Sequence, residues 1–293
     1  TVTIPTALAI SEIATNKRVE GGGEYYIISR SFGLNIGATI GIVLYLSQAI
    51  SVAFYVIAFT ESFSFLFDFL KDKYDLILPR QVISVPVMLL LAYMIIKKGA
   101  DMGMKVLYII TGILGVSLLL FFLGRTEFSA GSSFSLANAQ FRNMDQFFLV
   151  FAIVFPAFTG MTAGVGLSGD LKNPGKSIPL GTIAATLIGM VTYLLVAYKL
   201  AHSASPEDLV SNQLIMADIA VWGSVVIPLG LGAAPSSGAL GVALVAPRTL
   251  QALATDESFP SNKINEWLTK NRESDGEPVN ATLVTCVIAI FFV

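Results

Sequence analysis

Residues 146–182 read QFFLVFAIVFPAFTGMTAGVGLSGDLKNPGKSIPLGT, and this stretch decides the class of fold. It begins as an uncharged run long enough to cross a bilayer, and Pro156-Ala-Phe-Thr-Gly160 interrupts the run about halfway. In hydrocarbon every backbone amide and carbonyl needs a partner, so an interrupted helix is tolerated only inside protein or beside a polar cavity. Discontinuous helices of this kind build the ion and substrate sites of secondary transporters. The alternative is a simple proline kink packed within a helical bundle.

The composition of the whole chain points to the same environment. Of its 293 residues, 54% are hydrophobic and only 13% are charged, whereas a soluble domain carries about 25% charged residues. The mean hydropathy is +0.73. Most of the uncharged runs reach the roughly 20 residues that a helix needs to cross the hydrocarbon core. These runs are 34–60, 81–96, 106–124, 146–169, 177–198, 219–247 and 278–293.

We therefore expect an all-α, multi-pass integral membrane protein of a plasma or inner membrane, with the lipid bilayer as its surroundings. Six complete spans and a partial span at each end are predicted. The loops on one side of the membrane carry twelve Lys and Arg residues if loops alternate between sides, and those on the other carry six. Cytoplasmic loops are the richer in basic residues, so the first side is predicted to be cytoplasmic. That side includes the loop Gly169–Ser177.

Several motifs are weak as signs of enzyme chemistry or nucleotide binding. The loop Gly169–Ser177 resembles a phosphate-binding loop, but five residues instead of four separate its first glycine from Gly-Lys-Ser. The lone cysteine, Cys286, excludes an internal disulfide framework and a cysteine metal cluster. The single histidine, His202, is expected in a solvated loop. With no nucleophile–base pair or cofactor motif in the spans, we expect no enzyme, no cofactor, no resident metal and no nucleic-acid partner.

The central parts of the spans contain no Lys, Arg, Asp or Glu. A transported ion must therefore be held by neutral oxygens, backbone amides and helix ends. The interruption at Pro156–Thr162 offers carbonyls and hydroxyls to a cation, and amide groups at a helix end to an anion. A second neutral polar cluster, Ala234–Gly238, lies midway along another span. It is either part of an ion site or a set of small residues that lets helices pack closely.

Four stretches resemble the cation-chloride cotransporters, which belong to the amino acid–polyamine–organocation superfamily. The similarity covers nearly the whole chain, from the end of the family's second helix to the start of its ninth. The stretches are GGGEYYIISRSFG (21–33), VAFYVIAFTESF (52–63), FPAFTGMTAGVGLSGDLKNPGKSIPLGT (155–182) and VAPRTLQALATDESFP (245–260).

This resemblance implies a single transmembrane transporter domain over residues 1–293, truncated at both ends. The family fold has two inverted repeats of five helices, with broken first and sixth helices around a central site. The third helix would be Leu34–Leu70, the sixth Gln146–Gly169 and the eighth about Ile219–Thr255. The family's first and tenth helices, which carry further ion ligands, have no counterpart here, so we expect that the chain alone does not transport.

The resemblance also assigns ion ligands residue by residue. Potassium would be bound by the side chain of Tyr55, the carbonyl of Pro156 and the hydroxyl of Thr159. Chloride would face the backbone amides of Gly160, Met161 and Thr162. Sodium-coupled members place an alanine and two adjacent serines in the eighth helix. Counted back from Ala246 without gaps, the candidate sodium positions are Ala234, Ser237 and Gly238, with Ser236 adjacent.

The predicted function is a secondary active symporter that moves potassium and chloride together by alternating access, with sodium as a third candidate ion. An amino-acid or polyamine permease of the same superfamily is the alternative, and a channel would conduct without stoichiometric coupling. Dimerisation is common in the cotransporter family, so a homodimer is a candidate assembly.

Overall fold

The computed structural model describes residues 3–16, 22–128, 144–155, 160, 163–168, 171–273 and 276–293. In these ranges the regular structure is α-helical and no β-strand is present. Four of the helices are long and apolar enough to cross a membrane, and two shorter ones are also apolar. The prediction of an all-α, multi-pass membrane protein is confirmed. The four are α3 (Leu34–Glu61), α5 (Gln81–Leu123), α9 (Pro174–Ser203) and α12 (Gly223–Thr255); the shorter two are α7 (Met144–Val154) and α14 (Val279–Phe292).

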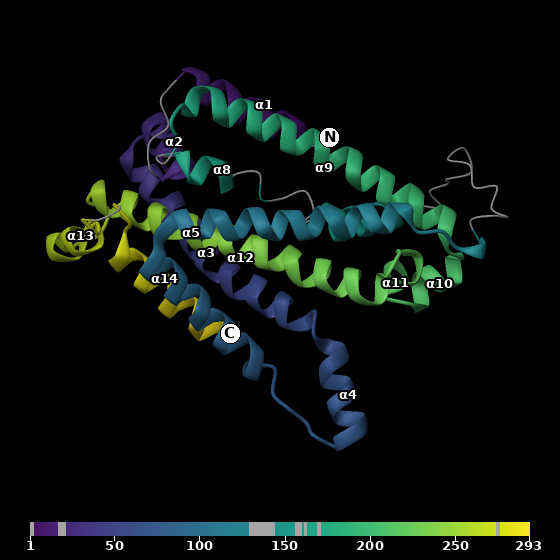
Figure 1. Cartoon of the computed structure of the whole chain (residues 1–293). Helices are drawn as coiled ribbons and strands as arrows, with labels where there is room; N and C mark the ends of the chain where they lie inside the picture. Colours follow the sequence, from purple (N-terminus) through teal and green to yellow (C-terminus); the bar gives the residue numbers. More distant parts are fainter. Residues whose placement is uncertain are drawn as a thin grey trace.

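Helix α5 contains two spans rather than one. Its 43 residues would reach about 64 Å at 1.5 Å per residue, twice the thickness of a hydrocarbon core. At Gly99 the backbone leaves the helix, with φ 66° and ψ −167°, and Figure 1 shows the chain turning sharply there. A positive φ is readily adopted only by glycine. The two uncharged runs predicted as separate spans therefore meet at one glycine turn.

Helix α12 lies at the centre of the bundle. Half of its most apolar stretch (50%) is buried, against 6% for α9, and Figure 1 shows it between α3 and the second half of α5. The helix α1 (Thr3–Asn16) instead runs beside α9. The elements that surround α12 therefore position any site built on it.

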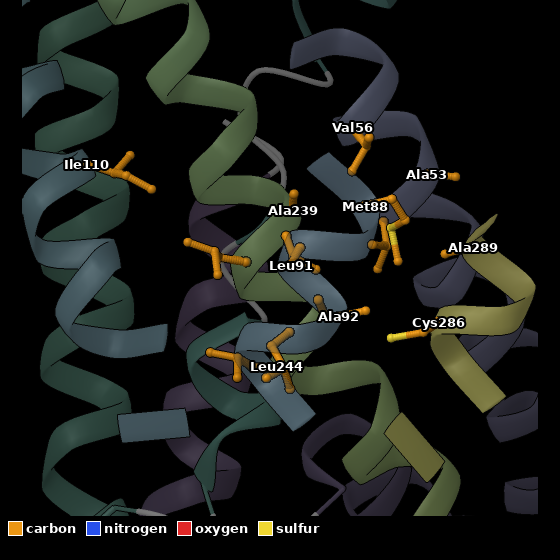
Figure 2. Close-up of a cluster of buried hydrophobic side chains, with 14 of the residues drawn as sticks. Ala53, Val56, Met88, Leu91, Ala92, Ile110, Ala239, Leu244, Cys286 and Ala289 are labelled. Carbon is orange, nitrogen blue, oxygen red and sulfur yellow. The ribbon is translucent and has the colours of Figure 1, made fainter. Parts of the chain in front are cut away.

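Small side chains allow these helices to pack closely. The largest buried cluster joins α3, α5, α12 and α14, and Figure 2 shows Ala53, Ala92, Ala239 and Ala289 pointing into it from the four helices. Each of these alanines is at most 9% exposed. Small residues are typical of helix interfaces in membranes, where close backbone approach supplies van der Waals contact that apolar solvent does not.

A buried ion pair joins the Gly99 turn to α12 and α14. Arg248 of α12 donates to both carboxylate oxygens of Glu277, at 3.2 and 3.3 Å, and both side chains are about 90% buried. The same carboxylate accepts a 2.7 Å hydrogen bond from the amide of Ala100, the residue after the turn. Arg272 donates to the carbonyl of Ile96 just before it. The segment that precedes α14 thus holds both sides of the turn in α5.

A second set of polar contacts fixes α2 (Gly23–Phe32) to the end of α12. Arg30 forms two hydrogen bonds with the carboxylate of Asp256, at 2.9 and 3.0 Å, and the Tyr25 hydroxyl donates a third at 2.8 Å. Burial raises the pKa of Tyr25, and the hydrogen bonds to Asp256 raise the pKa of Arg30. Both groups therefore keep the protonated forms that these contacts require.

Two sequence predictions are wrong at the ends of helices. The third helix was expected to reach Leu70, but α3 ends at Glu61 and a separate helix, α4 (Ser64–Tyr74), follows. Glu61 pairs with Arg80, which directly precedes α5, so this ion pair ties the end of one span to the start of the next. His202 does not lie in a loop. It occupies the last turn of α9, where its ring stacks on that of Tyr198.

Replacing Glu277 by alanine should destabilise the bundle. The change leaves the buried Arg248 without its carboxylate and the Ala100 amide without its acceptor. Removing one partner of a buried pair typically costs about 3–5 kcal/mol. The melting temperature in detergent, followed by size-exclusion chromatography, should fall markedly for Glu277→Ala. Lys105→Ala, which breaks a largely exposed pair with Asp101, is the matched control and should melt like the parent. Equal melting of both variants would contradict this role.

Candidate ion-binding site

The predicted interruption of the sixth helix is present. Helix α7 ends at Val154 and the next short helix, α8 (Ala163–Gly166), begins nine residues later. Between them Gly160 has φ +92°, a left-handed conformation outside the α-helix. The candidate ligands Pro156, Thr159, Met161 and Thr162 lie outside the described residues, so their roles remain predictions.

The short helix α8, which follows this interruption, is packed tightly. A Cβ atom on Gly166 of α8 would lie 2.3 Å from a methyl carbon of Val245 in α12, and a Cβ on Gly23 would lie 2.6 Å from the Cα of Gly166. Val165 is fully buried. Helix α8 is therefore clamped between α2 and α12. At Gly160, by contrast, a Cβ would meet no atom of the described residues within 4 Å.

The glycine-rich stretch near residue 22 has a packing role. Gly22 and Gly23 both have positive φ, at 94° and 50°. A Cβ on Gly22 would lie 2.4 Å from the Cβ of Ala252 in α12. These glycines let the start of α2 approach α8 and α12 closely, while Gly21 lies outside the described residues.

Tyr55 and Gly238 are brought together by the fold. Tyr55 lies on α3, partly buried against the large apolar cluster. A Cβ on Gly238 of α12 would lie 2.6–2.8 Å from three carbons of its ring. The phenol ring therefore rests on the α12 backbone at one of the candidate sodium positions. A candidate potassium ligand and a candidate sodium position, selected separately from the sequence, are therefore in contact.

Within the described residues, the two serines of the Ala234–Gly238 cluster donate hydrogen bonds to carbonyls of the preceding helical turn. The hydroxyl of Ser236 donates to the carbonyl of Gly232 at 2.8 Å, and that of Ser237 donates to the carbonyl of Ala234 at 2.7 Å. Hydroxyls that donate to the preceding turn keep their oxygen lone pairs available to a further group. Both serines are partly buried, and Ala234 is exposed.

Gln48 is a polar group that the sequence analysis did not select. It lies seven residues before Tyr55, hence two turns away on the same face of α3. Its side-chain carbonyl oxygen is buried, and within the described part of the chain it has no hydrogen-bond partner. A buried polar atom without a partner is costly. The sequence feature that could have identified Gln48 is a carboxamide in the middle of an apolar span, at helical spacing from Tyr55.

The whole chain matches one family of membrane proteins. A family model described as amino acid permease covers residues 1–293. The chain belongs to the amino acid permease family. This membership agrees with the superfamily named from the sequence motifs.

Similar proteins of known name support the narrower resemblance. The chain is 31% identical over 347 aligned residues to mouse (Mus musculus) solute carrier family 12 member 1, covering 100% of this chain and 31% of the relative. It is 30% identical over 344 residues to a protein of the moth Manduca sexta named bumetanide-sensitive sodium-(potassium)-chloride cotransporter, covering 99% and 32%. The resemblance to cation-chloride cotransporters is confirmed. The chain spans about a third of the length of these relatives.

Replacing Gly238 by alanine should disturb the contact between α3 and α12. The added methyl group would lie well inside van der Waals distance of the Tyr55 ring, and overpacking of this kind typically costs about 1–3 kcal/mol. The melting temperature of Gly238→Ala should fall below that of the parent. Gly241→Ala is the matched control on the same helix, because a Cβ there would meet nothing within 4 Å. If the two variants melt alike, the ring does not rest on Gly238.

Proposed function

We propose that this chain is part of a secondary active symporter that couples potassium to chloride by alternating access, with sodium as a third candidate ion. The observation that carries the proposal is the contact between Tyr55 of α3 and Gly238 of α12. It joins the candidate potassium residue to the candidate sodium positions. The names of the relatives support ion transport, since one of them is a sodium-(potassium)-chloride cotransporter.

The cation would be bound by neutral oxygens. In the proposed site the phenolic oxygen of Tyr55, the carbonyl of Pro156 and the hydroxyl of Thr159 replace part of the hydration shell of potassium. None of the described residues forms a hydrogen bond with the Tyr55 hydroxyl, so the oxygen can serve as a ligand. Gln48 adds a buried amide oxygen on the same face of α3.

The anion would be bound by backbone amides at the interruption. The proposed donors are the N–H groups of Gly160, Met161 and Thr162. The left-handed backbone of Gly160 supports this assignment, since it takes the chain out of the regular helix at that residue. Amide groups near helix ends favour negative charge.

Coupling would follow from electrostatics. Opposite unit charges about 4 Å apart attract by roughly 4 kcal/mol at an effective dielectric constant near 20. Because the proposed ligands are all uncharged, a bound potassium ion would be the nearest compensating charge for chloride. Each ion would then increase the affinity for the other, and symport would result.

An amino-acid or polyamine permease is the second candidate. The description of the matching family, amino acid permease, favours it. Such a permease would bind a substrate carboxylate at the broken helix and would leave room for a side chain. Uptake in liposomes distinguishes the two. Rubidium uptake that requires chloride supports the symporter, whereas chloride-independent amino-acid uptake supports the permease.

Tyr55→Phe should weaken the potassium dependence of transport. The change removes the phenolic oxygen while keeping the ring that packs on Gly238. In the full-length protein that carries this chain, chloride-dependent rubidium uptake should need a several-fold higher rubidium concentration for half-maximal rate. Protein abundance at the membrane should stay near the parent level. A parallel loss of uptake and abundance would mean that Tyr55 contributes to helix packing and does not bind potassium.

Ser237→Ala tests whether sodium takes part. If the α12 cluster binds sodium, the variant should require several-fold more sodium for half-maximal rubidium uptake, because one hydroxyl ligand is lost. Ser224→Ala, an exposed serine near the start of the same helix and outside the cluster, is the control and should leave the requirement unchanged. Sodium dependence that is unchanged in both variants removes the cluster as a sodium site.

A further inference from the structure

Helix α4 (Ser64–Tyr74, SFLFDFLKDKY) leaves its apolar side chains uncovered. No residue in it is buried, and Phe65, Phe69 and Tyr74 are 52%, 50% and 62% exposed. At 100° per residue, the apolar side chains fall on one side of the helix and most of the polar ones on the other. The apolar side carries Phe65, Leu66, Phe67, Phe69, Leu70 and Tyr74; the polar side carries Ser64, Asp68, Lys71 and Asp72.

The position of α4 is set by the spans on either side of it. Helix α3 has 28 residues, so it extends about 42 Å, the thickness of a bilayer with its headgroups. The ion pair between Glu61 and Arg80 holds the end of α3 next to the start of α5. The segment 62–80 therefore leaves and re-enters the membrane at the same surface. Figure 1 shows α4 turned away from the axis of α3 and standing apart from the bundle.

The charges on α4 favour the edge of the membrane over its interior. Lys73 lies among the apolar residues, but its ammonium group sits over the rings of Phe69 and Tyr74, 5.1 and 5.6 Å from their centroids. A lysine can in this way cover apolar surface while its charge stays in the headgroup region. Residues 64–75 carry three Asp and two Lys, a net charge of −1. Attraction to anionic lipid is therefore not the source of binding.

We propose that α4 lies in the plane of the membrane interface, with Leu66, Phe69 and Leu70 in the boundary between headgroups and acyl chains of zwitterionic phospholipid. Asp68 and Lys71, on the other side of the helix, face water. Amphipathic helices with a strongly polar face and low net hydrophobicity bind membranes in this way, and aromatic side chains favour this depth. The helix would hold the corner between α3 and α5 at a fixed depth in the bilayer. This inference does not depend on which ions the protein transports.

Site-directed spin labelling tests the depth of α4. In the full-length protein, Cys286, the one cysteine of residues 1–293, and every cysteine outside these residues are first replaced by alanine. A nitroxide is then attached at Phe69→Cys on the apolar side or at Lys71→Cys on the polar side. The protein is reconstituted in phosphatidylcholine liposomes. Collision rates are then measured with oxygen, which concentrates in lipid, and with a water-soluble nickel chelate.

The label at position 69 should collide several-fold more often with oxygen than with the nickel chelate, and the label at position 71 should show the reverse. Leu66→Cys and Asp68→Cys form a second pair, which repeats the comparison if either first variant folds poorly. Preference for nickel at all four positions would place α4 in water and overturn the proposal. Protection of positions 66 and 69 from both reagents would indicate packing against a second copy of the chain and would overturn it equally.

Discussion

The buried contact between Arg248 and Glu277 is the constraint on which the arrangement of the bundle depends. Between membrane helices, lipid supplies no hydrophobic driving force for association, because the acyl chains are as apolar as the side chains. Polar contacts at the helix ends therefore contribute strongly to register. Glu277 binds α12 through Arg248 and the second half of α5 through the amide of Ala100. One carboxylate, just before the start of α14, thereby joins two helices and fixes α12 relative to the turn at Gly99.

The fixed position of α12 in turn defines the candidate site. One end of the interrupted helix is clamped, since α8 packs between α2 and α12 with almost no spare volume around Gly166. The other side, at Gly160, has a backbone conformation that a helix cannot continue, and none of the described residues comes within 4 Å of a Cβ placed there. Two turns before Val245, which contacts α8, and on nearly the same face of α12, Tyr55 rests directly on Gly238. Rigid packing around a non-helical segment is the arrangement that a transporter needs to present backbone groups to an ion.

The sequence was sufficient for the features that follow from local chemistry. Charge-free runs predicted the spans, and Pro156 with the glycines after it predicted the interruption now seen at Gly160. The family motifs selected Tyr55 and Gly238, although nothing in the sequence showed that they touch. The uncharged run 34–60 ends within one residue of the end of α3 at Glu61, whereas the longer third helix, to Leu70, came from the family resemblance and was wrong.

Contacts between residues far apart in the chain also could not be predicted from the sequence. Glu277 stands in a polar, proline-bearing stretch that reads as solvated, yet its carboxylate is buried against an amide 177 positions away. Gln48 was passed over because a single carboxamide in an apolar helix carries no motif. For Pro156, Thr159, Met161 and Thr162 the described residues give no geometry, so the ligand assignment there still rests on resemblance alone.

The contact between the Tyr55 ring and Gly238 has an evolutionary consequence. In sodium-coupled cotransporters, by resemblance, serine occupies the position of Gly238. Here the phenol fills the space that the serine Cβ would need. A lineage descending from this protein could gain that hydroxyl only after α3 had shifted or the aromatic side chain had taken another rotamer. The order of substitutions is thus restricted. In a lineage where serine replaced this glycine, a substitution on the surface of α3 that faces it should have come first.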